Sequence, residues 1–285
     1  MTYWEWQKNA AYLLTAAGIE DAETEARLLV MQVGKMDGLM AYFDRKNQPV
    51  SEGERALLDE MLEKRQSHVP LQYLFGEQEF YGLPFFVDES VLIPRPETEL
   101  LLEAVLKESE GKRVLDLCTG SGCLAIGTAK LGKPAFVAAS DLSEAALDTA
   151  KKNAKRNDVS ITFFQGDLFE NVIGSYDIIV SNPPYIKKED MRQLMPEVRE
   201  HEPMMALCGG EDGLDFYRRI ATEAKPFLKE GGRLMMEIGY DQGEALLQLL
   251  TAQGYHEVEI RKDYAGLDRM AFAKWKGKET GENHV

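Results

Sequence analysis

A short apolar run in this chain is followed at once by two prolines. Residues 177–181 are rich in β-branched side chains, which predicts a buried strand. Pro183 and Pro184 cannot continue a central strand, because a proline donates no ladder hydrogen bond. The strand therefore ends near Asn182, and the ring of Tyr185 follows just beyond the prolines. Since ligands of open α/β sheets bind beyond the carboxyl ends of the strands, these four residues are predicted to form the reacting edge of a site.

The composition is that of a soluble globular protein with room for two domains. The chain has 285 residues, of which 44% are hydrophobic and 28% are charged. No run of about 18 apolar residues is present, so no membrane span is expected. Residues 1–8 lack a basic stretch followed by an apolar core, which argues against a signal peptide and predicts a cytoplasmic protein.

Charge and cysteine content argue against two kinds of site. The formal net charge of −15 argues against a protein that mainly holds nucleic-acid phosphates, since such domains carry basic faces. The three cysteines, Cys118, Cys123 and Cys208, are too few and too unevenly spaced for a disulfide framework or a zinc site. The sequence therefore predicts no metal and no direct nucleic-acid partner.

From residue 113 onward, strand patterns alternate with helical ones. Strands are predicted at 113–118, 135–140, 161–165, 177–182, 232–238, 255–261 and 269–275, and helices at 121–131, 143–157, 213–225 and 241–253. Such alternation indicates an α/β fold with a mostly parallel, seven-stranded sheet that helices cover on both faces. Only a short loop separates the last two strands, so these are predicted to pair antiparallel.

The residues before this α/β region have a different period and predict a separate domain. Residues 1–75 are predicted to form a helical bundle, in which Ser51 and Glu54 make a capping-box pattern at the start of a helix. Residues 76–93 are predicted to be a β-hairpin connector, 94–277 the α/β domain, and 278–285 a frayed polar tail. The irregular stretch 187–212 is predicted to be a lid or a substrate-binding segment.

A glycine turn after the first α/β strand predicts a cofactor loop. Gly120 and Gly122 let the backbone approach a ligand, because neither carries a Cβ. Asp141 ends the next strand, where a carboxylate can bind both hydroxyls of a ribose. This pattern fits a dinucleotide site. It also fits an S-adenosylmethionine site, in which Asp116 and the loop hold the amino-acid part of the cofactor.

A third acid, Asp167, follows the third strand of the α/β region. It is placed to accept a hydrogen bond from an adenine amino group while Leu168 packs on the ring. The alternative is that Asp167 is only a turn residue. Because Asp116, Asp141 and Asp167 lie at the ends of three successive strands and are expected to line one edge, a cofactor contact is the favoured interpretation.

Four stretches of the chain carry a resemblance to a known family. They are residues 91–99 (Val-Leu-Ile-Pro-Arg-Pro-Glu-Thr-Glu), 116–122, 182–186 (Asn-Pro-Pro-Tyr-Ile) and 262–269. Together they resemble the release factor glutamine methyltransferases, the PrmC or HemK family, over nearly the whole chain. Many methyltransferases that modify nitrogen on adenine, cytosine or glutamine share the Asn-Pro-Pro-Tyr element, but its combination with the first stretch is far more specific. One departure is Cys118, where the family usually has glycine.

The resemblance implies a Rossmann-like class I S-adenosylmethionine-dependent methyltransferase domain at 94–277. The implied reaction moves a methyl group to the side-chain amide nitrogen of the glutamine in the Gly-Gly-Gln motif of class 1 peptide chain release factors, and leaves S-adenosylhomocysteine. The implied cofactor contacts are Asp116, Cys118, Thr119, Gly120, Ser121, Gly122, Asp141, Asp167, Leu168 and Asn182. A monomer is expected, with residues 1–75 docking the protein substrate.

The poor nucleophilicity of an amide nitrogen explains the residue types at the reacting edge. Its lone pair is delocalised, so a site helps by accepting hydrogen bonds from both N–H groups and orienting the nitrogen. The side-chain oxygen of Asn182 and the carbonyl of Pro183 are the predicted acceptors, and Tyr185 is predicted to pack on the flat amide. Pro184 and Arg95 are predicted to join them in binding the substrate.

Other functions and roles compete with this interpretation. An adenine-N6 nucleic-acid methyltransferase would stack a flipped base on Tyr185, yet residues 1–75 are themselves acidic. A nicotinamide oxidoreductase leaves residues 182–185 unexplained, and the intact pair of acceptors argues against a binding module without turnover. Two residues keep a structural alternative to contacting a ligand. Arg95 can pair with the nearby Glu97, and Glu237, which is predicted to point toward the crevice from its strand end, can instead be a sheet-end hydrogen-bonding group.

Overall fold

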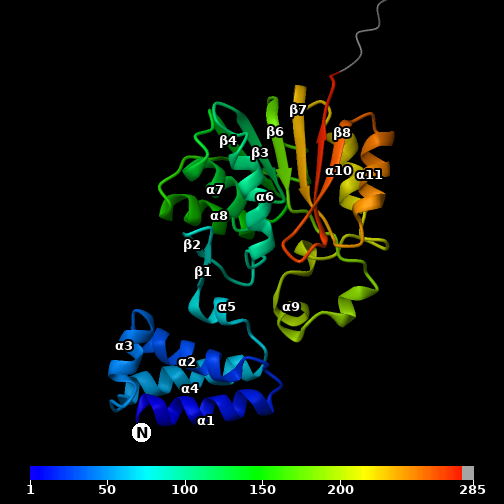
Figure 1. The fold of residues 1–285 in the computed structure, drawn as a ribbon. Coiled ribbons are helices and arrows are strands. Elements are labelled where there is room, and N and C mark those ends of the chain that lie inside the picture. Colours follow the sequence, from blue (N-terminus) through cyan, green and yellow to red (C-terminus); the bar gives the residue numbers. More distant parts are fainter. Residues whose placement is uncertain (278–285) are drawn as a thin grey trace, which may run out of the picture. The chain divides into compact units, whose positions relative to one another are not determined.

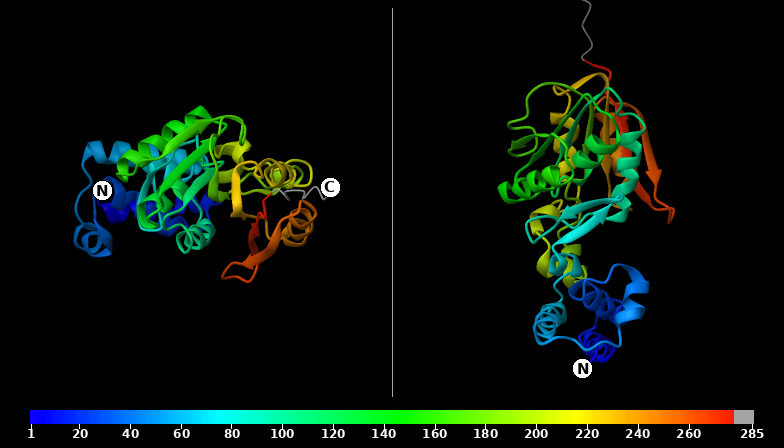
Figure 2. Two further views of the ribbon diagram at one scale, coloured as in Figure 1. Left: turned by 90° about the horizontal axis from the view of Figure 1, so that it is seen from above. Right: turned by 90° about the vertical axis from the view of Figure 1, so that its left-hand side faces the viewer.

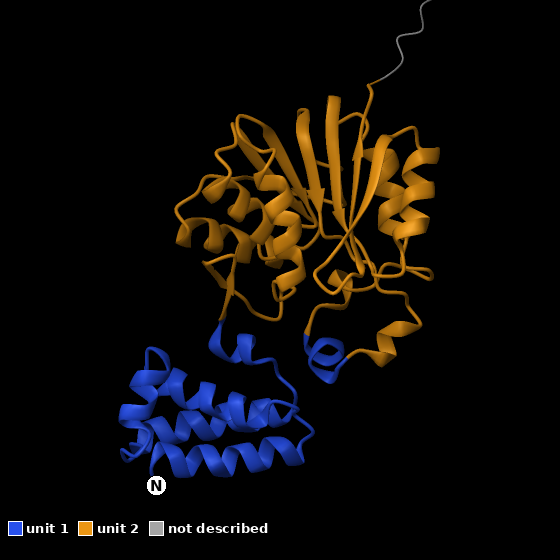
Figure 3. Ribbon diagram, in the orientation of Figure 1, with its two compact units in different colours: residues 1–76, 195–201 blue, residues 77–194, 202–285 orange. Residues whose placement is uncertain are grey.

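The computed structural model describes residues 1–277, and the predicted tail at 278–285 lies outside the described residues. The chain forms two compact units, which Figure 3 colours separately. One comprises residues 1–76 and 195–201, and the other comprises 77–194 and the chain from 202 onward. The α/β unit therefore begins with the hairpin rather than at residue 94, and a short piece of the stretch 187–212 groups with the helical unit.

The helical unit is a bundle of amphipathic helices. Its helices are α1 (Tyr3–Ala16), α2 (Ala22–Val33), α3 (Gly38–Arg45), α4 (Glu52–Gln66), α5 (Leu71–Phe75) and α9 (Pro196–His201), labelled in Figure 1. Trp6, Leu29 and Leu58 are among its buried core residues. At the start of α4, the Oγ of Ser51 accepts from the backbone N–H of Glu54 at 3.3 Å, which completes the predicted capping box. The predicted helical bundle is confirmed.

A buried ion cluster holds α9 within this unit. Arg65 on α4 donates to both carboxylate oxygens of Glu25 on α2, at 2.5 and 3.1 Å, and to Glu197 on α9 at 2.9 Å. His68 Nδ1 lies 3.2 Å from the same Glu197 oxygen. The Arg65 side chain is only 5% exposed, so the two carboxylates compensate for its desolvation. The stretch 187–212 is thus partly helical, and it also contains two 3₁₀ segments at Asp190–Gln193 and Met204–Ala206.

The second unit is built on a seven-stranded, mostly parallel sheet. Its strands are β3 (Arg113–Leu117), β4 (Phe136–Asp141), β5 (Thr162–Gln165), β6 (Tyr176–Ser181), β7 (Leu228–Glu237), β8 (His256–Lys262) and β9 (Asp268–Lys274), in the spatial order β5-β4-β3-β6-β7-β9-β8. The first five in this order run parallel, and β9 pairs antiparallel with both β7 and β8. The predicted sheet is confirmed, and its largest boundary shift is at β7, which begins at Leu228 rather than at 232.

Helices cover both faces of this sheet, as Figure 1 and Figure 2 show. They are α6 (Pro96–Leu106), α7 (Cys123–Leu131), α8 (Glu144–Arg156), α10 (Asp215–Glu223) and α11 (Gly243–Ala252). Along β6, Ile178 packs in the core with α6 and α7, whereas Ile179 packs in the core with α10 and α11. Because both faces are buried, the parallel strands are continuous apolar runs. Among residues 1–277, no helix is both long and apolar enough to cross a bilayer.

The predicted hairpin consists of β1 (Glu77–Phe80) and β2 (Leu83–Phe86). Its turn lies at Tyr81 and Gly82, both of which have positive φ angles, 51° and 74°. Phe85 is fully buried in the core of the α/β unit. Asn153 on α8 accepts from and donates to the backbone of the last β2 residue, at 2.6 and 3.0 Å. The hairpin is therefore part of the α/β unit.

Candidate active site

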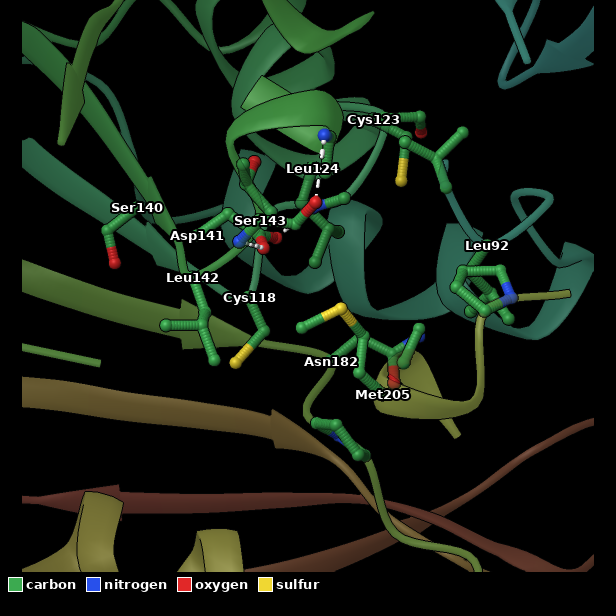
Figure 4. Close-up of a pocket in the computed structure, with 18 of the residues that line it drawn as sticks. Leu92, Cys118, Cys123, Leu124, Ser140, Asp141, Leu142, Ser143, Asn182 and Met205 are labelled. Carbon is green, nitrogen blue, oxygen red and sulfur yellow. Dashed lines mark hydrogen bonds between the residues drawn. The ribbon is translucent and has the colours of Figure 1, made fainter. Parts of the chain in front are cut away.

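The carboxyl ends of the central strands meet at one edge of the sheet. Leu117 on β3 pairs with Ser140 on β4 and with Ser181 on β6. The three chain segments that follow these residues therefore begin side by side. They line a cavity of about 230 Å³ at this edge, which Figure 4 shows in close-up.

Most of the predicted site residues lie around this cavity. Those that line it are Arg95, Cys118, Thr119, Gly120, Ser121, Asp141, Asp167, Leu168, Asn182 and Pro184. In Figure 4, Cys118, Asp141 and Asn182 come from three different strand ends and surround one hollow. Asp116, Gly122, Pro183 and Tyr185 are not among the lining residues.

Positive backbone φ angles shape the loop after β3. The φ angle is 56° at Cys118, 54° at Gly120 and 84° at Gly122. Gly120 lines the cavity, and a Cβ there would have no protein atom within 4 Å, so its missing side chain leaves room for a ligand. A Cβ at Gly122 would meet Ile126 at 2.9 Å, so this glycine lets the loop pack on α7. Cys118 adopts a left-handed conformation that favours glycine, which is a physical reason for the glycine expected there from the resemblance.

Asp141, at the end of β4, is held by the backbone of two loops. Its Oδ2 accepts from the N–H of Gly120 at 2.9 Å, and its Oδ1 accepts from the N–H of Ser143 at 2.9 Å. Burial raises the pKa of Asp141, and these backbone hydrogen bonds oppose the rise. Each carboxylate oxygen keeps a further lone pair, so Asp141 can still accept hydrogen bonds from a pair of hydroxyls in the cavity that it lines.

Asp116, at the end of β3, is fully buried inside the glycine loop. Its Oδ2 accepts from the hydroxyl of Thr119 at 2.6 Å and from the N–H of Ala125 at 3.1 Å. Its Oδ1 has no hydrogen-bond partner in the part of the chain that the structure describes. Burial raises the pKa of Asp116 to about 7. This carboxyl group therefore ties the loop to the start of α7 from a position outside the cavity lining.

Asp167 and Leu168 line the cavity beyond the end of β5. The Oδ1 of Asp167 accepts from the Nη1 of Arg219 on α10 at 3.0 Å, so one of its oxygens is already paired. Leu168 is buried and has a φ of 51°, and its carbonyl accepts from the hydroxyl of Ser140 at 2.9 Å. The backbone that presents both side chains to the cavity is therefore held to β4.

Hydrogen bonds behind the cavity hold the residues that follow β6. The Nδ2 of Asn182 donates to the Oγ1 of Thr98 at 3.2 Å. The hydroxyl of Tyr185 donates to the Oε1 of Glu237 at 3.2 Å, and burial raises the pKa of this tyrosine. The carbonyl of Pro183 accepts no hydrogen bond from the described part of the chain. Tyr185 is thus anchored to β7, whereas the Pro183 carbonyl and the Oδ1 of Asn182 keep their lone pairs.

Arg95 forms its ion pair with Glu202. Its Nη2 donates to Glu202 Oε1, and the N–H of Ile93 donates to the other carboxylate oxygen at 3.3 Å. Glu202 is only 6% exposed, so this contact ties the stretch 91–99 firmly to the stretch 187–212. The structure therefore gives Arg95 a partner distant in sequence, in place of the neighbouring Glu97.

Several cavity residues escaped the sequence analysis. They are Thr98, Cys123, Met205, Cys208 and Phe216 among others. Cys123 directly follows the glycine loop, whereas Met205, Cys208 and Phe216 come from parts of the chain distant from it in sequence. The only signal for Thr98 was its place in the stretch 91–99.

Comparisons with known proteins define the class of this fold. Residues 96–199 match the model described as Methyltransferase small domain, and residues 5–76 match the model described as PrmC N-terminal domain. A solved methyltransferase from Pyrococcus furiosus is similar in fold, with a TM-score of 0.57 at 21% identity over 75% of this chain and 99% of that one. The α/β unit is therefore a methyltransferase domain of the class I, Rossmann-like kind.

Curated relatives define the family. A release factor glutamine methyltransferase from Geobacter sulfurreducens is 41% identical over 261 residues, which cover 90% of this chain and 91% of the relative. Another from Bacillus cereus is 39% identical over 285 residues, which cover 96% of this chain and 99% of the relative. This chain belongs to the release factor glutamine methyltransferase family, which confirms the resemblance seen in its four motifs.

Replacing Asp116 with asparagine should make stability less dependent on pH. Because the folded pKa of about 7 lies above the unfolded value of about 4, the folded state binds the proton more tightly. The stability contribution of this group is present at low pH and is lost as pH rises from about 4 to about 7. The free energy of unfolding of Asp116→Asn minus that of the unsubstituted chain should therefore rise by about 3 kcal/mol from pH 5 to pH 8. Urea unfolding at each pH measures both free energies.

Asp177→Asn is the matched control for this series. Burial opposes ionisation of Asp177, yet hydrogen bonds from Lys229 and the Arg113 N–H keep its pKa below the usual value. The change in the free energy of unfolding caused by Asp177→Asn should therefore stay constant between pH 5 and pH 8. If the free energies of unfolding of Asp116→Asn and the unsubstituted chain also differ by the same amount at every pH, Asp116 does not have a raised pKa.

Proposed function

We propose that this chain transfers a methyl group from S-adenosylmethionine to the side-chain amide nitrogen of the glutamine in the Gly-Gly-Gln motif of class 1 peptide chain release factors. Membership of the release factor glutamine methyltransferase family supports the assignment of a release factor as the substrate. The observation that carries the proposal is the cavity itself, where the Asn182 amide and the glycine loop with Asp141 lie around one space. An adenine-N6 nucleic-acid methyltransferase is not favoured by the family match.

The cofactor side of the cavity fits S-adenosylmethionine. The carboxylate oxygens of Asp141 keep lone pairs that can accept hydrogen bonds from the ribose hydroxyls. The absence of a side chain at Gly120 leaves room for the cofactor. We assign Asp167 and Leu168 to the adenine, and the loop 116–122 to the amino-acid part. The bound cofactor supplies an electrophilic methyl group on a positively charged sulfur.

The acceptors at the end of β6 suit a glutamine amide. One N–H of the substrate amide would donate to the Oδ1 of Asn182 and the other to the carbonyl of Pro183, so that the nitrogen is turned toward the cofactor. Both acceptors bind more strongly as this nitrogen gains positive character, which lowers the barrier rather than only tightening binding. The methylated nitrogen is acidic while it is cationic and passes its extra proton to water, so a dedicated strong base is not required. Pro184 lines the cavity, and we assign to it and to Tyr185, which follows it in the chain, the packing of the flat amide.

The helical unit exposes apolar side chains that suit a protein partner. We assign docking of the release factor to the helical unit, where Leu39, Met40 and Phe43 on α3 are 53%, 76% and 54% exposed. The net charge of −15 supports a protein substrate rather than a nucleic acid. A cytoplasmic monomer completes the proposal.

A transfer assay tests this function. The purified chain is incubated with methyl-labelled S-adenosylmethionine and a release factor, with the Gln-to-Ala variant of its Gly-Gly-Gln motif, or with DNA and RNA. Label should enter only the unsubstituted release factor, because only it offers the amide nitrogen. Label on nucleic acid, or on both release factors alike, would reject the proposal.

Two substitutions should separate cofactor binding from transfer. Asn182→Ala removes an acceptor for the substrate nitrogen, so kcat should fall about 10²- to 10³-fold while the Kd for the cofactor stays within about twofold. Asp141→Ala removes charged hydrogen bonds to the ribose, so the Kd should rise about 10- to 100-fold. Calorimetry gives Kd, and label transfer gives kcat.

Asp148→Ala is the matched control for the acidic substitution. Asp148 lies on α8, is 59% exposed in its side chain and pairs with Lys151 at the surface. Neither Kd nor kcat should change in this variant. If Asn182→Ala weakens cofactor binding as much as it slows transfer, Asn182 mainly holds the cofactor.

A further inference from the structure

A chain of buried polar groups runs from β7 to the reacting edge. Glu237, at the end of β7, and Thr98, on α6, are each only 2% exposed. The hydroxyl of Thr98 lies 2.7 Å from Glu237 Oε2, and the Nδ2 of Asn182 lies 3.2 Å from the same hydroxyl oxygen. Of these three residues, Thr98 and Asn182 line the cavity and Glu237 does not.

Donors and positive charge surround the carboxyl group of Glu237. Its second oxygen, Oε1, accepts from the hydroxyl of Tyr185 at 3.2 Å. Burial raises the pKa of Glu237, whereas the hydrogen bond from Thr98, the charge of Arg269 and the hydrogen bond from Tyr185 oppose the rise. Arg269 is itself fixed by Asp263, with its Nε and Nη2 each 3.1 Å from Oδ2.

The proton of Thr98 determines which way the Asn182 amide points. A threonine hydroxyl has one proton to donate and two lone pairs to accept with. When that proton is given to the carboxylate of Glu237, the side of the oxygen that faces Asn182 can only accept. Asn182 must then present its NH₂ group to Thr98, and its Oδ1 is the atom left to contact a ligand. A flipped amide would oppose two oxygens and lose the hydrogen bond.

We propose that Thr98 is a positioning residue which, through its hydrogen bond to Glu237, fixes the Asn182 amide with Oδ1 toward the substrate nitrogen. This inference rests on the proposed role of Asn182 as an acceptor. It also explains two of the four family motifs that have no direct part in the proposed methyl transfer. Thr98 belongs to the stretch 91–99, and Asp263 and Arg269 belong to the stretch 262–269 behind Glu237.

Substitutions at Thr98 test the proposal. Thr98→Val keeps the shape but removes the hydroxyl, so kcat for release factor methylation should fall about 10- to 100-fold, somewhat less than on loss of the acceptor itself. The Kd for S-adenosylmethionine should stay within about twofold. Thr98→Ser keeps the hydroxyl and should recover most of kcat. If the valine variant does not fold, Thr98→Ala replaces it, because alanine also lacks the hydroxyl. Its kcat and Kd are then compared with those of the unsubstituted chain.

A double substitution separates positioning from a general loss of structure. In an Asn182→Ala background the amide is absent, so Thr98→Val should lower kcat by less than about twofold further. Thr128→Val is the matched control, because Thr128 is fully buried on α7 and its hydroxyl has no partner among residues 1–277. This control should leave kcat unchanged.

Each outcome of these measurements decides between the alternatives. A serine variant as slow as the valine variant, or an equal loss from Thr98→Val in both backgrounds, would overturn the positioning role while leaving the methyltransferase function intact. Full activity of Thr98→Val would overturn it as well. No methylation of the release factor by the unsubstituted chain would overturn both the function and the inference.

Discussion

Parallel pairing of β3, β4, β5, β6 and β7 brings the carboxyl ends of these strands to one edge of the sheet, and the candidate site depends on this pairing. The pairing of Leu117 with Ser140 and Ser181 sets the glycine loop beside the residues that follow β4 and β6. The prolines after Asn182 then stop β6 at the level where the cavity opens. A shift of one residue in this register would exchange the side chains that pack against α6 and α7 with those that pack against α10 and α11, so core packing and site geometry are specified together.

Buried acids support the cavity from outside its lining. Asp116 ties the glycine loop to α7, Glu202 ties the stretch 91–99 to the stretch 187–212, and Glu237 anchors Thr98 and Tyr185. None of these acids is among the lining residues. A buried carboxyl group is costly unless donors compensate it, so each of them constrains the groups that it holds. The rigidity of the reacting edge thus comes from polar contacts behind it.

Local patterns in the sequence were sufficient to predict the strands, the capping box at Ser51 and the glycine loop, because each of these features depends on residues that are neighbours along the chain. They also led to the family, through motifs that stand together in one chain. Contacts between distant segments were not predictable in this way: nothing near Arg95 indicated Glu202, and nothing near Arg65 indicated Glu197. The conformation of Cys118 and the support of Asn182 by Thr98 likewise became visible only in the folded chain.

The position of the transferred methyl group distinguishes a side-chain amide acceptor from every other acceptor on the release factor. A release factor is incubated with this chain and S-adenosylmethionine that carries a deuterated methyl group, and its Gly-Gly-Gln peptide is sequenced by tandem mass spectrometry. Acceptors placed for both N–H groups of a side-chain amide predict one labelled methyl group on the side-chain nitrogen of that glutamine. A methyl group on any other residue or on the peptide backbone, or none at all, would contradict the claim.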